Sequence, residues 1–266
     1  MRAKGFWIVL ICFVTCTRIL AETPQTTDPN QPVWDGLYRR VHVPVLMYHY
    51  VSDIPQNADA TRRNLTITPL EFQAQMSYLS AQSYTTISLY QLYDTLMRGD
   101  SLPAKPIVLT FDDGYLDDYL NVFPVLRQYG FTATFFIITG IVDASNPGYL
   151  SWGDIQAMSN AGMNMEAHTV THASLRGQTQ SFDVNQVQGS IQDLATHTGE
   201  TPRIFAYPDG QYDTTAMKAL QSSGIWIAVT TRGSAWETSN HPLEVPRLRI
   251  DHGMGALGLD QLLTHR

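Results

Sequence analysis

Short apolar runs alternate with longer segments of helical periodicity along the chain after residue 42. The apolar runs lie at 43–48, 84–87, 106–111, 132–138, 163–167, 203–206 and 225–230. The helical segments lie at 88–99, 115–129, 151–161, 182–197, 213–223 and 257–263, and a further helix begins at Thr68. This alternation is typical of a mostly parallel sheet with crossover helices. About seven such units in one domain predict an α/β fold of the (β/α) barrel type.

Several helix ends carry their own signals. The segment 68–71, Thr-Pro-Leu-Glu, combines a capping box with a proline at the first helical position. Ser88 and Gln91 have the same spacing and predict the start of the next helix. Gly130 follows the segment 115–129 and is placed to end that helix.

The N-terminus has the features of a secretory signal peptide. Two basic residues, Arg2 and Lys4, precede an apolar run, and Ala21 offers a small residue for cleavage. We therefore expect a signal peptide at 1–21, a flexible leader rich in Thr, Pro, Gln and Asp at 22–40, and one folded domain at 41–266. The expected location is secreted or periplasmic. An uncleaved N-terminal anchor, or a lipid anchor at Cys16, is the alternative.

Composition narrows the chemistry of the mature chain. Its two cysteines, Cys12 and Cys16, both lie in the predicted signal peptide, which excludes disulfides, thiolate metal sites and cysteine nucleophiles after cleavage. Cleavage also removes three basic residues and changes the net charge from −7 to −10. An acidic chain is a poor partner for nucleic acid or an anionic membrane. No later stretch is apolar enough for a transmembrane segment, and the sequence does not indicate an oligomeric state.

Two short segments carry candidate hydrolytic chemistry. The segment 110–114, Thr-Phe-Asp-Asp-Gly, places Asp112 and Asp113 at the end of an apolar run. The segment 168–172 places His168 and His172 four residues apart, about one helical turn, so that both rings can point the same way. Two histidines and one aspartate form a three-ligand Zn²⁺ site, which leaves the second carboxylate as a base. Taken singly, the aspartates could instead cap a helix and the histidines could be surface residues.

The segments 110–114, 168–172 and 205–210, the last reading Phe-Ala-Tyr-Pro-Asp-Gly, resemble the three main motifs of the polysaccharide deacetylases, carbohydrate esterase family four. The likeness extends from about residue 43 to the C-terminus. It implies a distorted (β/α) barrel that holds a divalent metal ion, usually Zn²⁺. It also implies removal of N- or O-acetyl groups from a polysaccharide such as chitin, peptidoglycan, poly-N-acetylglucosamine or xylan.

The resemblance implies roles for individual residues. Asp113, His168 and His172 match the metal ligands, and Asp112 matches the catalytic base. Tyr207 matches the residue whose backbone N–H faces the developing oxyanion.

The chain departs from the ordinary family pattern at two places. Ala206 stands where the family has an arginine that steadies the base; Arg247 and Arg249 are both candidates to replace it. The family's late Leu-x-His motif, which supplies the general acid, is missing near the C-terminus. The segment 45–49, Val-Leu-Met-Tyr-His, resembles the displaced motif of a circularly permuted subgroup, which includes deacetylases of β-1,6-linked poly-N-acetylglucosamine in biofilm. We therefore expect His49 to be the general acid, although it could also be a histidine packed at a strand end.

The sequence thus predicts a metal-dependent hydrolase that removes N-acetyl groups from a polysaccharide, with poly-β-1,6-N-acetylglucosamine favoured. Peptidoglycan, chitin oligomers and O-acetyl xylan are alternative substrates. The alternative of another class is a non-catalytic carbohydrate-binding protein, which is expected to lack one of the four motif aspartates and histidines; all four are present.

Overall fold

The structure is a computed structural model that describes residues 34–265. The predicted signal peptide and residues 22–33 of the predicted leader lie outside the described residues. Residues 34–39, also expected to belong to the leader, contact the helix α3 (Leu89–Arg98). The Asp35 N–H donates to the Met97 carbonyl at 3.1 Å, and the Arg39 guanidinium donates to the Leu96 carbonyl at 3.2 Å.

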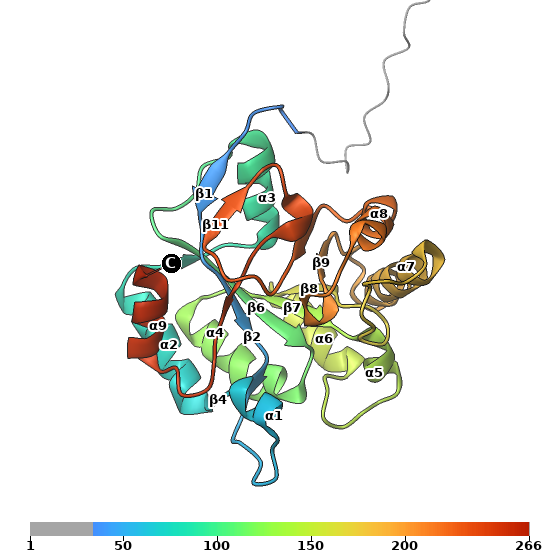
Figure 1. Cartoon of the computed structure of the whole chain (residues 1–266). Coiled ribbons are helices and arrows are strands. Elements are labelled where there is room, and N and C mark those ends of the chain that lie inside the picture. Colours follow the sequence, from blue (N-terminus) through green and yellow to red (C-terminus); the bar gives the residue numbers. More distant parts are fainter. Residues whose placement is uncertain (1–33, 266) are drawn as a thin grey trace, which may run out of the picture. The chain divides into compact units, whose positions relative to one another are not determined.

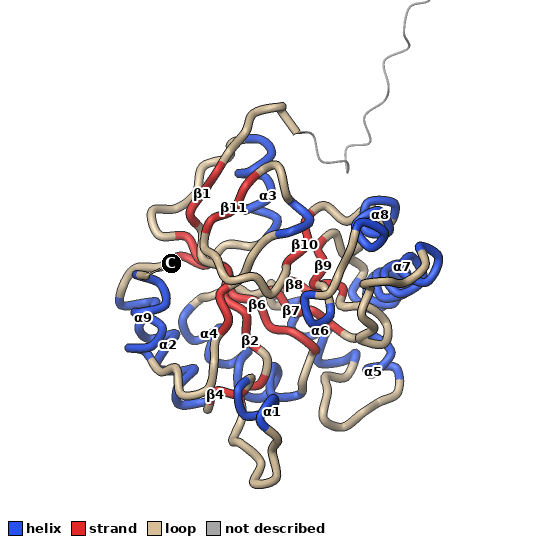
Figure 2. The backbone as a smooth tube through the Cα atoms, viewed as in Figure 1, coloured by secondary structure: helices blue, strands red, loops and turns tan. Residues whose placement is uncertain are grey.

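A curled parallel sheet forms the centre of the domain (Figures 1 and 2). Its strands follow the order β10 (Ile227–Val229), β9 (Ile204–Ala206), β8 (Asn164–Ala167), β7 (Thr134–Ile137), β6 (Pro106–Asp113), β2 (Val45–Tyr48) and β12 (Leu248–Arg249). A further short strand, β5 (Thr85–Thr86), pairs in parallel with the start of β6. This arrangement confirms the predicted α/β fold of about seven units, here in the form of a curled half-barrel.

The segment before β12 joins the two ends of this strand order. Val245 forms an isolated parallel bridge with Val229 at the end of β10, and the Thr230 N–H donates to the Val245 carbonyl at 2.8 Å. Three residues later, at Leu248, the chain enters β12, which pairs with β2. Arg247 therefore lies between the two ends of the sheet, where its side chain can reach the middle strands.

Helices cover the outside of the sheet, and their starts follow the sequence signals. The longer ones are α2 (Pro69–Ala81), α3, α4 (Phe123–Tyr129), α6 (Trp152–Asn160), α7 (Gln180–Thr198), α8 (Thr214–Ser222) and α9 (Ala256–Thr264), and two shorter ones are α1 (Ala60–Asn64) and α5 (Thr139–Asp143). Capping boxes are formed at Thr68 and Ser88, as predicted. In none of the helices among the described residues is there a stretch long and apolar enough to cross a membrane.

Side chains alternate between the two faces of each strand, and each face has its own core. On β6, Leu109 and Phe111 belong to the larger apolar cluster beneath the outer helices, whereas Val108 belongs to the second cluster. Thr110 and Asp112 lie two and four residues beyond Val108, so their side chains point to the same face of the sheet as Val108 does. The polar site is therefore built at the end of the face that carries the smaller core.

The structure corrects one predicted helix and adds two strand pairs. The segment 115–129 was expected to be one regular helix; residues 116–129 are helical, but the stretch Asp118–Val122 is a π-helix that precedes α4. The added pairs were not predicted: β1 (Arg40–His42) with β11 (Trp236–Thr238), and β3 (Tyr50–Val51) with β4 (Thr66–Ile67).

Candidate active site

The two neighbouring aspartates end β6 and point to different partners. Asp113 is the last residue of the strand and has φ +80°, a conformation that is uncommon for a residue with a side chain. Gly114 follows with φ +74°, and a Cβ there would lie 3.1 Å from the Ile137 side chain. Because of this tight turn, the side chains of Asp112 and Asp113 point in different directions. One carboxylate can therefore bind an ion while the other is not a ligand of it.

The two histidines come together on a loop, not on a helical turn. The loop follows β8, and two of its residues, Thr169 and His172, have positive φ values of +64° and +57°. The ring centroids of His168 and His172 are 4.9 Å apart. The expectation that the rings converge was therefore right, but the helical spacing that we gave as the reason was wrong: the strand end and the backbone turns bring the rings together.

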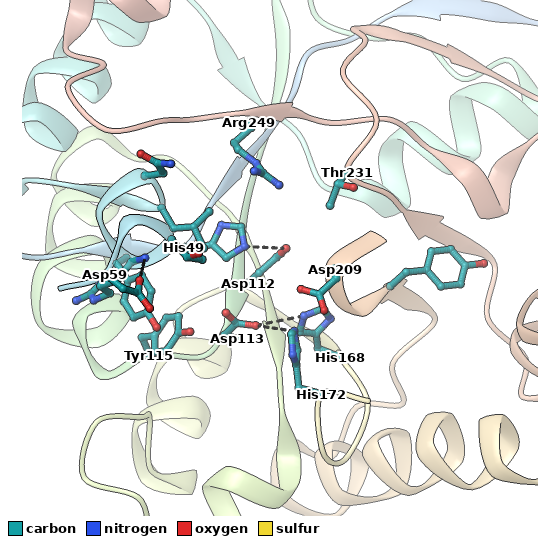
Figure 3. Close-up of a pocket in the computed structure, with 16 residues that line it drawn as sticks. His49, Asp59, Asp112, Asp113, Tyr115, His168, His172, Asp209, Thr231 and Arg249 are labelled. Carbon is teal, nitrogen blue, oxygen red and sulfur yellow. Dashed lines mark hydrogen bonds and ion pairs between the residues drawn. The ribbon is translucent and has the colours of Figure 1, made fainter. Parts of the chain in front are cut away.

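Asp113, His168 and His172 converge in a geometry that fits a cation (Figure 3). Asp113 Oδ1 lies 3.3 Å from Nε2 of each histidine. In a tetrahedral site with zinc–ligand distances near 2.1 Å, two ligand atoms are about 3.4 Å apart. Asp113 Oδ1 is also buried and has no hydrogen-bond partner among the described residues. The ligand atoms therefore have the spacing of a three-ligand metal site, and Asp113 Oδ1 has a lone pair that no hydrogen bond uses.

The tautomer of His168 supports the same conclusion. Its Nδ1 is 2.8 Å from the Ala206 carbonyl, which can only accept a hydrogen bond, so Nδ1 carries the proton. In the neutral ring, Nε2 then presents a lone pair toward the carboxylate of Asp113. These two lone pairs repel each other unless a metal ion or a proton lies between them, and a carbonyl that orients a ligand histidine is typical of metal sites.

Asp112 is held by a buried arginine. Two bonds of 2.6 and 2.7 Å join the Arg247 guanidinium to the two carboxylate oxygens of Asp112, and Arg247 also donates to the carbonyl of Thr230 and the hydroxyl of Thr110. Only 1% of Arg247 and 3% of Asp112 are exposed. Burial raises the pKa of Asp112, but the Arg247 charge outweighs it and holds that pKa below its usual value. Of the two arginines that the sequence left open, Arg247 pairs with Asp112.

His49 lies on the other side of Asp112. Its Nε2 is 3.9 Å from Asp112 Oδ2, at the junction of β2 and β3. Burial lowers the pKa of the His49 ring, and the charges of Asp112 and Asp113 oppose this. Its Nδ1 is buried and has no hydrogen-bond partner among residues 34–265. The structure therefore places the expected general acid beside the expected base.

Tyr207 also lies in the pocket wall, but its backbone N–H has a partner. The N–H is 3.3 Å from the Val229 carbonyl, a long hydrogen bond at the end of the β9–β10 pair. The next residues form a tight turn in which Asp209 has φ +54°. The structure thus places Tyr207 near the candidate ligands without leaving its N–H free.

A pocket of about 510 Å³ encloses these groups, a size typical of small-molecule sites. Residues without an expected role at the site also line it, among them Tyr50, Arg62, Tyr115 and Thr231; Asp209, from the third motif, and Arg249 complete this part of the wall. Tyr50, Arg62 and Arg249 lie on short elements, β3, α1 and β12. The sequence could also have indicated Tyr115, since it directly follows the motif that ends at Gly114.

Comparison with known proteins agrees with this geometry. The family model described as polysaccharide deacetylase matches residues 99–228. YxkH of Bacillus subtilis, whose name proposes a polysaccharide deacetylase, is 27% identical over 86% of this chain and 79% of its own length. The poly-β-1,6-N-acetyl-D-glucosamine N-deacetylase of Staphylococcus epidermidis is 27% identical over 71% of this chain and 70% of its own length.

A solved structure shows the same fold. The Streptococcus pyogenes deacetylase PplD, determined in complex with acetate, superposes with a TM-score of 0.79 at 26% identity, over 85% of this chain and 99% of that one. These matches, together with the half-barrel and its motif residues, show that the chain carries a polysaccharide deacetylase domain of carbohydrate esterase family four and is a hydrolytic deacetylase acting on amide bonds of polysaccharides.

Proposed function

We propose that this protein is a metal-dependent deacetylase that removes N-acetyl groups from an N-acetylglucosamine-containing polysaccharide and releases acetate. The observation that carries the proposal is the convergence of Asp113, His168 and His172 beside a fourth group, Asp112, whose two carboxylate oxygens are bound by Arg247. A carbohydrate-binding protein that does not catalyse a reaction has no need of a second buried carboxylate next to the three candidate metal ligands.

Asp113, His168 and His172 would hold a divalent ion, with Zn²⁺ favoured by the two imidazoles and one carboxylate. When bound, such an ion polarises the acetyl carbonyl and makes a water molecule easier to deprotonate. The chain supplies the ligands on two different strand ends, β6 and the loop after β8, and fixes the His168 tautomer through Ala206.

Asp112 acts as the general base. It accepts a proton from the water that attacks the acetyl carbon. Arg247 holds both carboxylate oxygens, so the base keeps one orientation, and the arginine charge keeps Asp112 ionised. The arginine that the family places next to Tyr207 is therefore replaced by one from a distant part of the chain.

His49 delivers a proton to the leaving nitrogen. Its Nε2 lies 3.9 Å from Asp112 Oδ2, so both side chains face the part of the pocket where the amide would bind. Tyr207 contributes its N–H to the oxyanion, which requires that this N–H turn from the Val229 carbonyl toward the substrate. The length of that bond, 3.3 Å, supports this exchange because a long hydrogen bond costs little to give up.

The favoured polymer is poly-β-1,6-N-acetylglucosamine, which the name of the Staphylococcus epidermidis relative specifies. Such a polymer is found outside the cell, and a secreted or periplasmic location agrees with the signal peptide predicted from the sequence. Peptidoglycan, chitin oligomers and O-acetyl xylan are the alternatives that share the same chemistry.

Acetate release from a panel of substrates tests this proposal. The panel contains β-1,6 and β-1,4 N-acetylglucosamine oligomers, peptidoglycan and acetyl xylan, each tested with wild type and with Asp112→Asn. We expect the fastest release from the β-1,6 oligomers and none from the variant. Release from acetyl xylan alone would contradict the amide substrate. Protein that binds metal but releases no acetate from any N-acetylglucosamine polymer would favour a carbohydrate-binding function.

A further inference from the structure

The loop after β9 begins at Tyr207 and is tightly folded where it lines the pocket. The Gly210 N–H donates to the Tyr207 carbonyl at 2.8 Å, and Asp209 between them has φ +54°. Gly210 itself has φ +65°, and a Cβ there would clash with the side chain of Thr231. The loop therefore has little room to take a different path at this wall of the pocket.

A second tyrosine packs on the side chain of Tyr207. The ring centroids of Tyr207 and Tyr212 are 4.4 Å apart with planes inclined by 21°, and Phe205 contacts Tyr207 edge-on at a centroid distance of 5.6 Å. Tyr207 is fully buried, and its hydroxyl has no hydrogen-bond partner among the described residues. Packing against neighbouring rings, rather than a hydrogen bond, therefore holds this side chain.

Tyr212 has the polar anchor that Tyr207 lacks. Its hydroxyl donates to Glu244 Oε1 at 2.7 Å. The same oxygen accepts from the Arg232 guanidinium at 2.7 Å, and Glu244 Oε2 is 2.9 Å from His241 Nδ1. The Arg232 guanidinium carbon also lies over the Tyr212 ring, 5.5 Å from its centroid. Tyr212 is thus fixed both at its hydroxyl and over its ring, and Glu244 joins these contacts.

Glu244 belongs to the same segment as the arginine that holds the proposed base. Arg247 follows it closely in the chain and binds both carboxylate oxygens of Asp112. The residues between them pair with the end of β10. The Asp112 carboxylate and, through Tyr212, the side chain of Tyr207 are therefore both held by the segment 244–247, although they lie at the ends of different strands, β6 and β9.

We propose that Tyr212 and Glu244 are positioning residues that hold Tyr207 where its backbone N–H can reach the developing oxyanion, an inference that rests on the proposed function. Neither residue lines the pocket or touches the reacting atoms. The Tyr207 N–H has to turn from the Val229 carbonyl to the oxyanion, and an anchored ring keeps that change small. Because the oxyanion forms only as the reaction proceeds, a misplaced N–H should lower kcat and leave KM nearly unchanged.

The test measures kcat and KM for acetate release from the N-acetylglucosamine polymer that wild type deacetylates fastest, together with Zn²⁺ affinity and melting temperature. Tyr212→Phe removes the hydroxyl and keeps the ring on Tyr207. Glu244→Ala removes the acceptor, whereas the amide oxygen in Glu244→Gln can still accept from Tyr212. We expect kcat to be about 10- to 100-fold lower in Tyr212→Phe and Glu244→Ala, with KM and Zn²⁺ affinity near those of wild type. Most of the activity should be recovered in Glu244→Gln.

Two further variants separate this bond from the other contacts of Glu244. His241→Ala is the matched control, because it removes another partner of Glu244 and leaves the Tyr212 bond in place. It should have the kcat of wild type. If Tyr212 and Glu244 act through one bond, the double variant with Tyr212→Phe and Glu244→Ala should have a kcat no lower than that of the less active single variant.

Each other outcome rejects the inference at a different level. A wild-type kcat in Tyr212→Phe, or a loss that appears in KM or in Zn²⁺ affinity instead, would overturn the positioning role and leave the proposed function standing. An equal loss of kcat in Glu244→Gln and Glu244→Ala would overturn the role of the Tyr212 bond. A Tyr212→Phe protein that no longer folds would assign the bond to stability. A wild-type protein that releases no acetate from any N-acetylglucosamine polymer would overturn the proposed function, and this inference with it.

Discussion

At the scale of single residues, two adjacent carboxylates have different surroundings. Asp113 faces two histidines, and Asp112 faces an arginine from a segment more than a hundred residues away. The motif alone predicted both aspartates but not this arginine. Arg247 and Arg249 are two residues apart, so the sequence alone does not distinguish them. Their burial differs because Arg247 precedes β12 and donates to the Thr230 carbonyl beside β10, whereas Arg249 ends the strand.

Removal of the arginine charge should destabilise the fold strongly. Arg247→Met leaves the buried Asp112 carboxylate without a partner, and breaking such a pair costs about 3–5 kcal/mol. We expect the free energy of unfolding, measured with urea, to fall by that order. Arg249→Met is the matched control at an exposed position and should change the free energy of unfolding by less than about 1 kcal/mol. Equal losses in the two variants would contradict the assignment of Arg247 as the partner of Asp112.

At the scale of elements, the sequence predicted those whose signals are local. Helices α2 and α3 begin where their capping boxes were expected, and the apolar run at 106–111 became β6. Strands β1 and β11 were missed because each has three residues and its partner lies about two hundred residues away. Such pairs depend on tertiary contacts rather than on a local pattern.

The capping box at Thr68 gives a prediction for an element remote from the site. The Thr68 hydroxyl accepts from the Glu71 N–H at 3.2 Å, and Thr68→Ala removes this bond from the start of α2. Loss of an N-cap of this kind costs about 1 kcal/mol. We expect a slightly lower midpoint of urea unfolding with unchanged Zn²⁺ affinity. A variant with reduced metal affinity would show that α2 couples to the site, which the structure does not lead us to expect.

At the scale of the whole molecule, a parallel sheet explains how distant motifs meet. The carboxyl ends of parallel strands share one edge, so residues after β2, β6, β8 and β9 line one pocket. This convergence followed from the alternation of strands and helices in the sequence. The sequence could not show that segment 245–247 joins the ends of the sheet, because its pairing with β10 is a single bridge.

The fold as a whole also contains a carboxyl group that should make its stability depend on pH. Glu237 on β11 is fully buried, and neither oxygen has a partner among the described residues; burial raises its pKa from 4.5 to about 9. The unfolded chain loses this proton above pH 4.5, so folding stability falls as pH rises from there toward 9.

Glu237→Gln removes that ionisation. We expect the variant to have a melting temperature higher than that of wild type at pH 8, with the difference shrinking toward pH 4.5, as measured by thermal unfolding across this range. The corresponding difference in the free energy of unfolding should grow by up to about 1.4 kcal/mol per pH unit. Glu200→Gln, at an exposed site, is the control. A difference that does not depend on pH would show that Glu237 is not buried as a neutral acid.

The most direct measurement is the metal content of two matched variants, Asp112→Asn and Asp113→Asn, dialysed after loading with Zn²⁺, alongside acetate release from β-1,6 N-acetylglucosamine oligomers. The account predicts that Asp112→Asn retains the ion at wild-type stoichiometry and releases no acetate, whereas Asp113→Asn loses both. His168→Ala should behave as Asp113→Asn does. Loss of the ion from Asp112→Asn, or its retention in Asp113→Asn, would contradict the division of roles between the two neighbouring carboxylates.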